Sequence, residues 1–141
     1  MDKQLTVIPH LSFSGNCEEA LNAYVAAFGG EVFYLSRWSA ETFDVNPGQI
    51  GKVMHAEFRL GATRMAASDD FTATGNSPVK LMIHMDDMSE ALHAVGILSA
   101  GGTIISPLKP HPAPDDGGCG SITKDRFGYT WIITCPNPDK H

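Results

Sequence analysis

The chain has 141 residues, 43% of them hydrophobic, which is enough to bury the core of one compact domain or of two half-sized modules. A net charge of −6, with only ten Lys and Arg residues that never cluster, excludes the basic surface that binds nucleic acid. Three widely spaced cysteines without a C-x-x-C pair exclude a disulfide framework and a structural zinc site.

The N-terminal stretch of the sequence has no basic segment followed by an apolar one, as a signal peptide would. No apolar run approaches the length of a membrane span. We therefore expect a cytoplasmic protein with no membrane partner.

The first half of the chain predicts the order β-α-β-β-β. Residues 5–13 alternate between apolar and polar side chains, as a half-buried strand does. A helix is predicted over 14–30, with Asn16 and Glu19 as its capping box and an apolar stripe along one side. Strands are then predicted at 31–38, 52–60 and 63–68.

Gly61-Ala62 predicts a hairpin between the last two of these strands. If Leu60 lies opposite Thr63, the ladder places Glu57 opposite Ala66. The face turned away from the helix then carries four polar residues, and the helix-facing side carries four apolar ones. The polar set is His55, Glu57, Arg59 and Arg64, and the apolar set is Met54, Ala56, Phe58 and Met65.

The second half repeats the pattern after a polar linker. A strand at 79–85 leads into a helix that begins with Asp87 and Glu90 and ends at Gly101-Gly102. Because cap, apolar stripe, Gly-Gly end and following strand recur in one order, we interpret the chain as internally duplicated. Strands are predicted at 103–106, 119–124 and 129–135, with a Pro- and Gly-rich loop at 107–118.

Each half is thus one β-α-β-β-β module, and the predicted fold class is α+β. The modules are 1–70 and 78–136, with a linker at 71–77 and a tail at 137–141. A helix covers only one face of such a sheet, so we expect the two paired modules to form a curved sheet with a concave ligand cavity.

Three motifs resemble the PhnB-like branch of the vicinal oxygen chelate superfamily, which includes glyoxalase I, bleomycin-resistance proteins and extradiol dioxygenases. They occur in the family's order along nearly the whole chain: Gly15 to Leu21 with Tyr24, Met54 to Glu57, and Asp125 to Gly128 with Trp131. The resemblance implies a homodimer of paired modules that holds a small molecule on the concave sheets. Members of this branch are often labelled methyltransferases, but no Gly-rich strand-to-helix turn for a nucleotide-like methyl donor is present.

The resemblance also locates the superfamily's metal ligands. In this sequence they fall at Ile8 or Pro9, Ala66, Lys80 and Ile132. None of these side chains is an ordinary neutral or anionic ligand, so we expect no metal at the standard positions and no cofactor.

A different metal set stays open. Strand parity places His10, His55, Glu57 and His84 on the cavity faces, and two histidines with one carboxylate suit a divalent metal ion. The alternative is that His10 and His84 are half-exposed strand residues, and that His55 and Glu57 form a hydrogen-bonded polar patch with the two arginines.

Two functions are therefore compatible with the sequence, which does not decide whether the protein is an enzyme. One is the binding of an unknown small molecule without the standard metal ligands. The other is a metal-dependent reaction of the lyase or dioxygenase kind at the non-standard His/Glu set. The expected ligand-binding residues are those that parity places in the cavity and two aromatic walls: His10, Ser12, Trp38, Phe43, His55, Glu57, Lys80 and His84.

Overall fold

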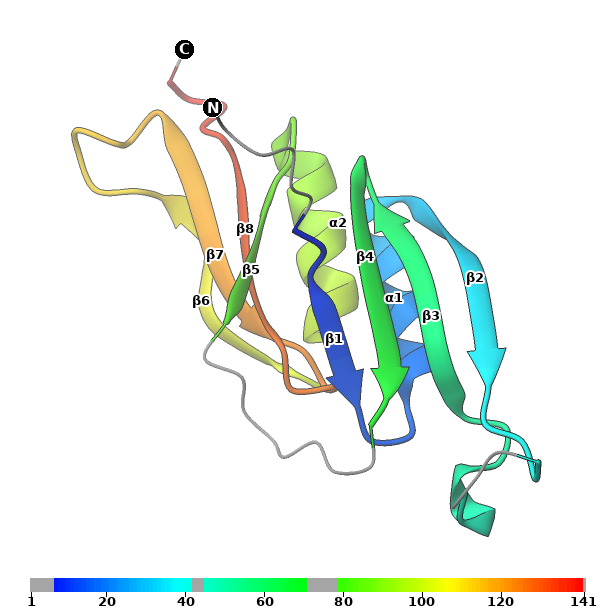
Figure 1. Cartoon of the computed structure of the whole chain (residues 1–141). Helices are drawn as coiled ribbons and strands as arrows, with labels where there is room; N and C mark the ends of the chain where they lie inside the picture. The colour runs from blue at the N-terminus through cyan, green and yellow to red at the C-terminus, as the bar shows by residue number, and fades with distance from the viewer. Residues whose placement is uncertain (1–6, 42–44, 71–78, 141) are drawn as a thin grey trace. The chain divides into compact units, whose positions relative to one another are not determined.

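The computed structural model describes residues 7–41, 45–70 and 79–140, and the chain divides into two compact units, Met1–Ala73 and Thr74–His141 (Figure 1). Each unit contains one helix and one four-stranded mixed sheet. The predicted α+β class and the β-α-β-β-β order of each half are confirmed. The module limits predicted from the sequence, and the shared concave cavity, stay predictions.

The first unit has the strand order β1-β4-β3-β2, with β1 parallel to β4 and the other pairs antiparallel. Its hairpin has the predicted register, with Leu60 opposite Thr63 and Glu57 opposite Ala66. The elements are β1 (His10–Phe13), α1 (Cys17–Phe28), β2 (Gly30–Arg37), the short 3₁₀ helix η1 (Pro47–Gln49), β3 (Val53–Leu60) and β4 (Thr63–Asp69).

The second unit has the equivalent order β5-β8-β7-β6. Here β5 runs parallel to β8, and the remaining pairs are antiparallel. The elements are β5 (Lys80–His84), α2 (Met88–Ser99), β6 (Thr103–Pro110), β7 (Gly118–Lys124) and β8 (Thr130–Pro136).

Each core lies between the helix and one face of its sheet. In the first unit Leu11 and Phe13 are buried, and the Phe13 ring lies 6.4 Å from that of Tyr24 in α1. In the second unit Trp131 is fully buried, as its parity with Ile133 predicted. Each large side chain buried in this way contributes about 1.5–3 kcal/mol of hydrophobic stabilisation.

Both helices end as the Gly-Gly pairs predict. Gly29 follows α1 with a φ of 76°, and Gly101 follows α2 with a φ of 73°. Both values lie in the left-handed region, which glycine adopts without steric cost. None of the helices in the described residues is long and apolar enough to cross a membrane.

The side-chain cap predicted for Asn16 is wrong. Asn16 makes no side-chain capping hydrogen bond, and the carboxylate of Asp69 takes that role by accepting from the backbone N–H groups of Gly15 and Cys17. The cap predicted for the second helix is confirmed, because Asp87 Oδ1 accepts from Glu90 N at 2.8 Å.

Three strand predictions also need correction. β1 is shorter than predicted, since residues 7–9 are not in a strand and residues 5–6 lie outside the described part. Met54 is 38% exposed instead of facing the helix, because a register shift near the start of β3 buries Val53 in its place. β6 continues to Pro110, into the first residues of the predicted loop, since its position at the sheet edge tolerates proline.

Candidate functional site

The helix-free face of the first sheet carries the polar side chains that parity predicted. On β1, exposed His10 and half-buried Ser12 alternate with the buried Leu11 and Phe13. On β3, half-buried His55 and Glu57 alternate in the same way with buried Ala56 and Phe58. Because the alternation is unbroken here, these four polar side chains share the face opposite α1.

The strand register brings two of them to one level. His10 on β1 and Glu57 on β3 both lie directly opposite Ala66 on the intervening strand β4. They are therefore about two strand spacings, roughly 10 Å, apart, with only the methyl group of Ala66 between them. We call His10, Ala66 and Glu57 the central row.

Glu57 is held from both sides on this face. Its carboxylate pairs with the Arg64 guanidinium, and Glu57 Oε2 lies 3.7 Å from His55 Nε2. The hydrogen bond from Arg64 lowers the pKa of Glu57, with a smaller contribution from the charge of His55. Glu57 is thus ion-paired with Arg64, whereas Arg59 pairs with Glu31 at 3.5 Å.

Aromatic rings border this cluster on the edge strand β2. The Tyr34 ring lies 5.9 Å from the His55 ring, and the Arg64 guanidinium lies 5.8 Å from the Phe33 ring. A register shift between Val32 and Tyr34 exposes both aromatic side chains. The sequence pattern does not predict this, because regular alternation would place only one of two adjacent residues on a given face.

His10 of the central row contacts β4, and the two predicted aromatic walls lie away from the row or outside the described residues. His10 Nε2 is 3.4 Å from Ser68 Oγ. Trp38 follows β2, and its Nε1 donates to the backbone oxygen of Asp69 at 3.4 Å. Phe43 lies outside the described residues, and the role of Trp38 as a pocket wall stays a prediction.

In the second unit, Lys80 and His84 lie exposed on β5, on the face without a helix. His84 Nδ1 is 2.9 Å from Thr134 Oγ1 on β8. Met82, between them on the same face, is 65% exposed. This face therefore combines two polar side chains with an exposed thioether.

The non-standard metal set stays a prediction. Within the described residues no group of three His, Cys, Asp or Glu side chains is arranged to hold a metal ion. In the first unit His55 lies beside Glu57, whereas His10 stands on β1 with β4 between. His84 belongs to the other unit.

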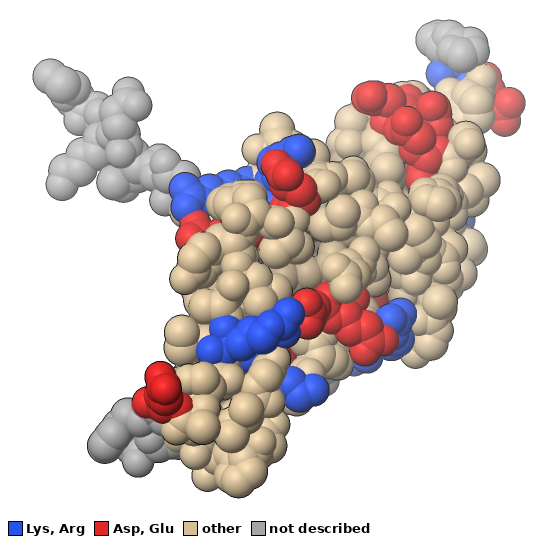
Figure 2. Space-filling view, turned by 90° about the vertical axis from the view of Figure 1, so that its right-hand side faces the viewer, with Lys and Arg blue, Asp and Glu red and all other residues tan. Residues whose placement is uncertain are grey.

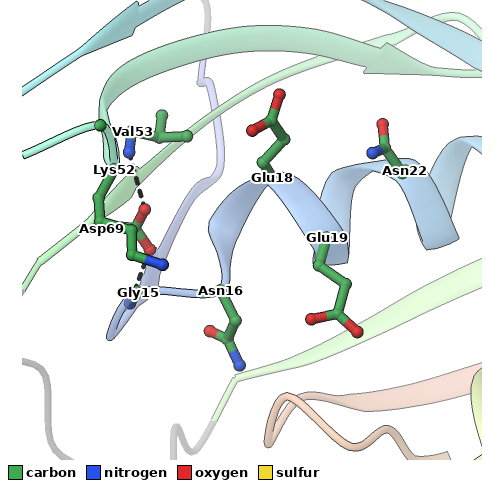
Figure 3. Close-up of a pocket in the computed structure, with 9 residues that line it drawn as sticks. Gly15, Asn16, Glu18, Glu19, Asn22, Lys52, Val53 and Asp69 are labelled. Atoms are coloured by element: carbon green, nitrogen blue, oxygen red, sulfur yellow. Dashed lines mark hydrogen bonds between the residues drawn. The ribbon is translucent and has the colours of Figure 1, made fainter.

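A cavity of about 400 Å³ lies elsewhere, where the start of α1 meets the start of β3 and the end of β4 (Figure 3). Asp69, 1% exposed, holds this region together. Its Oδ1 accepts from Gly15 N at 2.8 Å and Cys17 N at 3.0 Å, and its Oδ2 accepts from Val53 N at 2.8 Å. Parity could have indicated this buried carboxylate, since Asp69 follows Met65 and Ala67 on the helix-facing side of β4.

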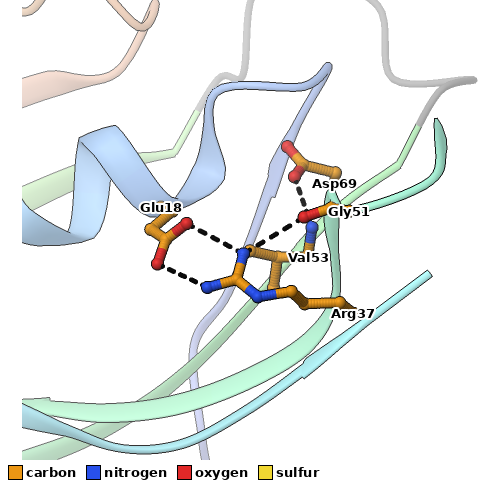
Figure 4. A network of polar contacts seen from close by, with 5 residues as sticks. All are labelled: Glu18, Arg37, Gly51, Val53 and Asp69. Carbon is orange, nitrogen blue, oxygen red and sulfur yellow. Dashed lines mark hydrogen bonds and ion pairs between the residues drawn. The ribbon is translucent and has the colours of Figure 1, made fainter. Parts of the chain in front are cut away.

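The rim of the cavity is also bonded internally (Figure 4). Arg37 donates to both carboxylate oxygens of Glu18, at 2.9 and 2.8 Å, and to the Gly51 carbonyl at 3.1 Å. This hydrogen bonding lowers the pKa of Glu18. Asp69 and Glu18 are thus engaged in holding the fold. Figure 2 shows acidic side chains next to basic ones at several places on the surface.

Cys17 beside this cavity is not an activated nucleophile. Burial, with smaller contributions from the charges of Asp69 and Glu18, raises its pKa to about 12. Since the thiolate is the reactive form, the thiol is chemically quiet near neutral pH.

Comparison with known proteins identifies relatives over almost the whole chain. The family described as 3-demethylubiquinone-9 3-methyltransferase matches residues 5–134. A putative 3-demethylubiquinone-9 3-methyltransferase, PhnB protein, from Bacillus cereus is 25% identical, with a TM-score of 0.79 over 93% of this chain and 99% of that one. Protein PA1353 from Pseudomonas aeruginosa is 26% identical, with a TM-score of 0.80 over 94% and 98%.

A more distant structure shares the fold alone. The glyoxylase/bleomycin resistance protein/dioxygenase domain from Frankia sp. EAN1pec is 11% identical, with a TM-score of 0.67 over 99% of this chain and 97% of that one. The resemblance to the PhnB-like branch of the vicinal oxygen chelate superfamily is thereby confirmed.

Proposed function

We propose, from the premise that the chain belongs to the family described as 3-demethylubiquinone-9 3-methyltransferase, that it binds a small molecule on the helix-free faces of its sheets. The central row supports this proposal, because it sets two polar side chains around a methyl group on a face that α1 does not cover. A few directed polar groups beside apolar surface are typical of ligand sites.

The residues that we propose for binding are those that strand parity placed on these faces, together with the two aromatic walls. In the first unit they are His10, Ser12, Trp38, Phe43, His55 and Glu57, and in the second they are Lys80 and His84. No standard metal ligand takes part.

Methyl transfer is not part of the proposal, although the family's description names it. Asp69 accepts from the N–H groups of Gly15 and Cys17 at the start of α1, and Asp87 accepts from that of Glu90 at the start of α2. These donors are therefore already engaged by carboxylates, so they do not favour an anionic group of a nucleotide-like cofactor.

We also propose that the protein is cytoplasmic and forms a homodimer. Phe33 and Tyr34 on edge strand β2 are 48% and 50% exposed, and Ile104 and Ile105 on edge strand β6 are 46% and 57% exposed. Apolar side chains on open sheet edges favour pairing with a second chain. Light scattering should give twice the chain mass of 15.2 kDa, and the single-chain mass at micromolar concentration would contradict the dimer.

The binding face is tested by backbone ¹H–¹⁵N NMR spectra recorded with a library of small polar compounds. A bound compound should shift the amide signals of Ser12, Glu57 and Ala66. Glu57→Gln should weaken its binding severalfold, since the change removes the charge that orients Arg64. Glu31→Gln also removes one negative charge, but at the edge of the sheet, and should leave binding unchanged. Shifts confined to other regions would contradict the proposed site.

Spectra of the same kind distinguish the metal-dependent alternative from metal-free binding. Zn²⁺ or Mn²⁺ is titrated into the wild type and into His55→Ala. Stoichiometric binding that the variant loses would replace the metal-free proposal by the metal-dependent one.

A further inference from the structure

A second, smaller cavity of about 180 Å³ opens among β6, β7 and β8 of the second unit. Its floor includes Ile122 and Ile132, which lie opposite each other on β7 and β8. Its walls include Ser106 and Lys109 from β6 and His111 from the loop that follows. We call it the Lys109 cavity.

The position of His111 in this cavity depends on Gly120 of β7. A Cβ atom on Gly120 would lie 2.4 Å from His111 Cε1, whereas one on Gly118 would make an ordinary contact, 3.5 Å from His111 Cδ2. The imidazole therefore occupies the space that a side chain at position 120 would fill. Backbone bonding fixes the start of the loop, since His111 N donates to the Gly118 carbonyl at 3.0 Å.

Three of the four polar side chains that line the Lys109 cavity have no side-chain partner among the described residues, whereas the fourth, Ser121, donates to the Ile133 carbonyl at 3.2 Å. Among the described residues, no side-chain hydrogen bond or ion pair engages Ser106, Lys109 or His111. The described lining of the cavity contains no Asp or Glu, although the chain as a whole carries a net charge of −6. Asp116 of the same loop is bound elsewhere, 3.0 Å from Lys140 Nζ.

We propose that the Lys109 cavity binds a short-chain aliphatic carboxylate. The ammonium of Lys109 and the donors of His111 and Ser106 hold the carboxylate, and the chain lies on Ile122 and Ile132. The volume equals that of about six water molecules, which suits an acid of a few carbon atoms. This inference rests on the proposed function, since Ile132 lies opposite Met82 on the helix-free face of the second sheet. It uses none of the residues proposed above for binding, so the amide shifts expected in each test tell the two failures apart.

Butyrate is the probe that tests the proposal, and its neutral isostere butyramide and inorganic phosphate are the comparisons. NMR titrations of the full chain should show butyrate shifting the amide signals of Gly118, Gly120 and Ile122, with weaker binding of both other compounds. Equal binding of butyramide would overturn the anionic part of the proposal. Equal binding of phosphate would overturn the apolar part.

Two pairs of variants locate the binding. Lys109→Gln should weaken butyrate binding about tenfold, the loss of one charge-assisted hydrogen bond, while Lys124→Gln at the other end of the β6–β7 ladder should not. Gly120→Ala displaces the imidazole and should weaken binding too, whereas Gly117→Ala, whose Cβ meets nothing within 4 Å, should not. Unchanged affinity in Lys109→Gln, in a protein with a native spectrum, would refute the site.

Discussion

The carboxylate of Asp69, at the end of β4, accepts a hydrogen bond from the backbone N–H of Val53, at the start of β3, over 2.8 Å. The same side chain accepts from Gly15 and Cys17 before and within the first turn of α1. One buried carboxylate thus ties the helix to two strands. Hydrogen bonds to charged acceptors are worth more than those to neutral ones, so this residue has a large effect on stability.

Asp69→Ala should therefore lower the free energy of unfolding by about 3 kcal/mol or more, because it leaves buried N–H groups of Cys17 and Val53 without an acceptor. Asp69→Asn retains one oxygen and should cost less. Urea denaturation followed by circular dichroism measures both. Asp86→Asn, at an exposed position, is the control and should change stability by less than about 0.5 kcal/mol. An Asp69→Ala variant as stable as this control would contradict the assigned role.

The role of Asp69 also shows the limit of a local sequence pattern. Asn16 and Glu19 have the spacing of a capping box, but the acceptor that the helix uses lies 52 residues from Cys17. A contact over that separation depends on the tertiary fold, which local propensity does not encode. Asp87 caps α2 as predicted because that contact is local.

Periodicity predicted the face of each strand better than its ends. The hairpin at Gly61 fixed the register, so Glu57 lies opposite Ala66 as expected. Pro107 indicated a loop, yet β6 continues past it, because an edge strand needs no backbone donor on its open side. Register shifts in β2 and near the start of β3 then exposed Phe33 and Met54, which strict alternation does not predict.

In the second unit, the buried side chain of Trp131 makes a hydrogen bond that should contribute to stability. Its indole Nε1 donates to Asp125 Oδ2 at 2.7 Å, and Asp125 Oδ1 accepts from the N–H groups of Phe127 and Tyr129. Trp131→Phe should lower the free energy of unfolding by about 2–3 kcal/mol, through the lost hydrogen bond and the smaller ring. Trp38→Phe makes the same change at a half-buried indole with a 3.4 Å contact and should cost less. Equal losses in the two variants would contradict this prediction.

The ion pair between Glu57 and Arg64 predicts a pH dependence. Because Arg64 lowers the pKa of Glu57 below its ordinary value of 4.5, this carboxylate favours the folded state above that value. The contribution is lost as pH falls through the lowered pKa of the folded protein. Side-chain NMR titration should show the pKa of Glu57 rising in Arg64→Gln but not in Arg59→Gln, since Arg59 pairs with Glu31. A Glu57 pKa that does not respond to Arg64→Gln would exclude the pair in solution.

The thiol of Cys17 should resist modification in the folded protein. With a pKa of about 12 and no exposed surface, it should remain unalkylated by iodoacetamide at pH 8 over times that fully label a solvent-exposed cysteine. Ala26→Cys, at an exposed position of the same helix, provides that reference within one molecule. Asp69→Asn should speed labelling of Cys17, because it removes a negative charge that opposes the thiolate and loosens the helix start. Peptide mass spectrometry after timed quenching measures both thiols. If Cys17 were labelled as fast as the thiol introduced by Ala26→Cys, the start of α1 would have to open freely in solution.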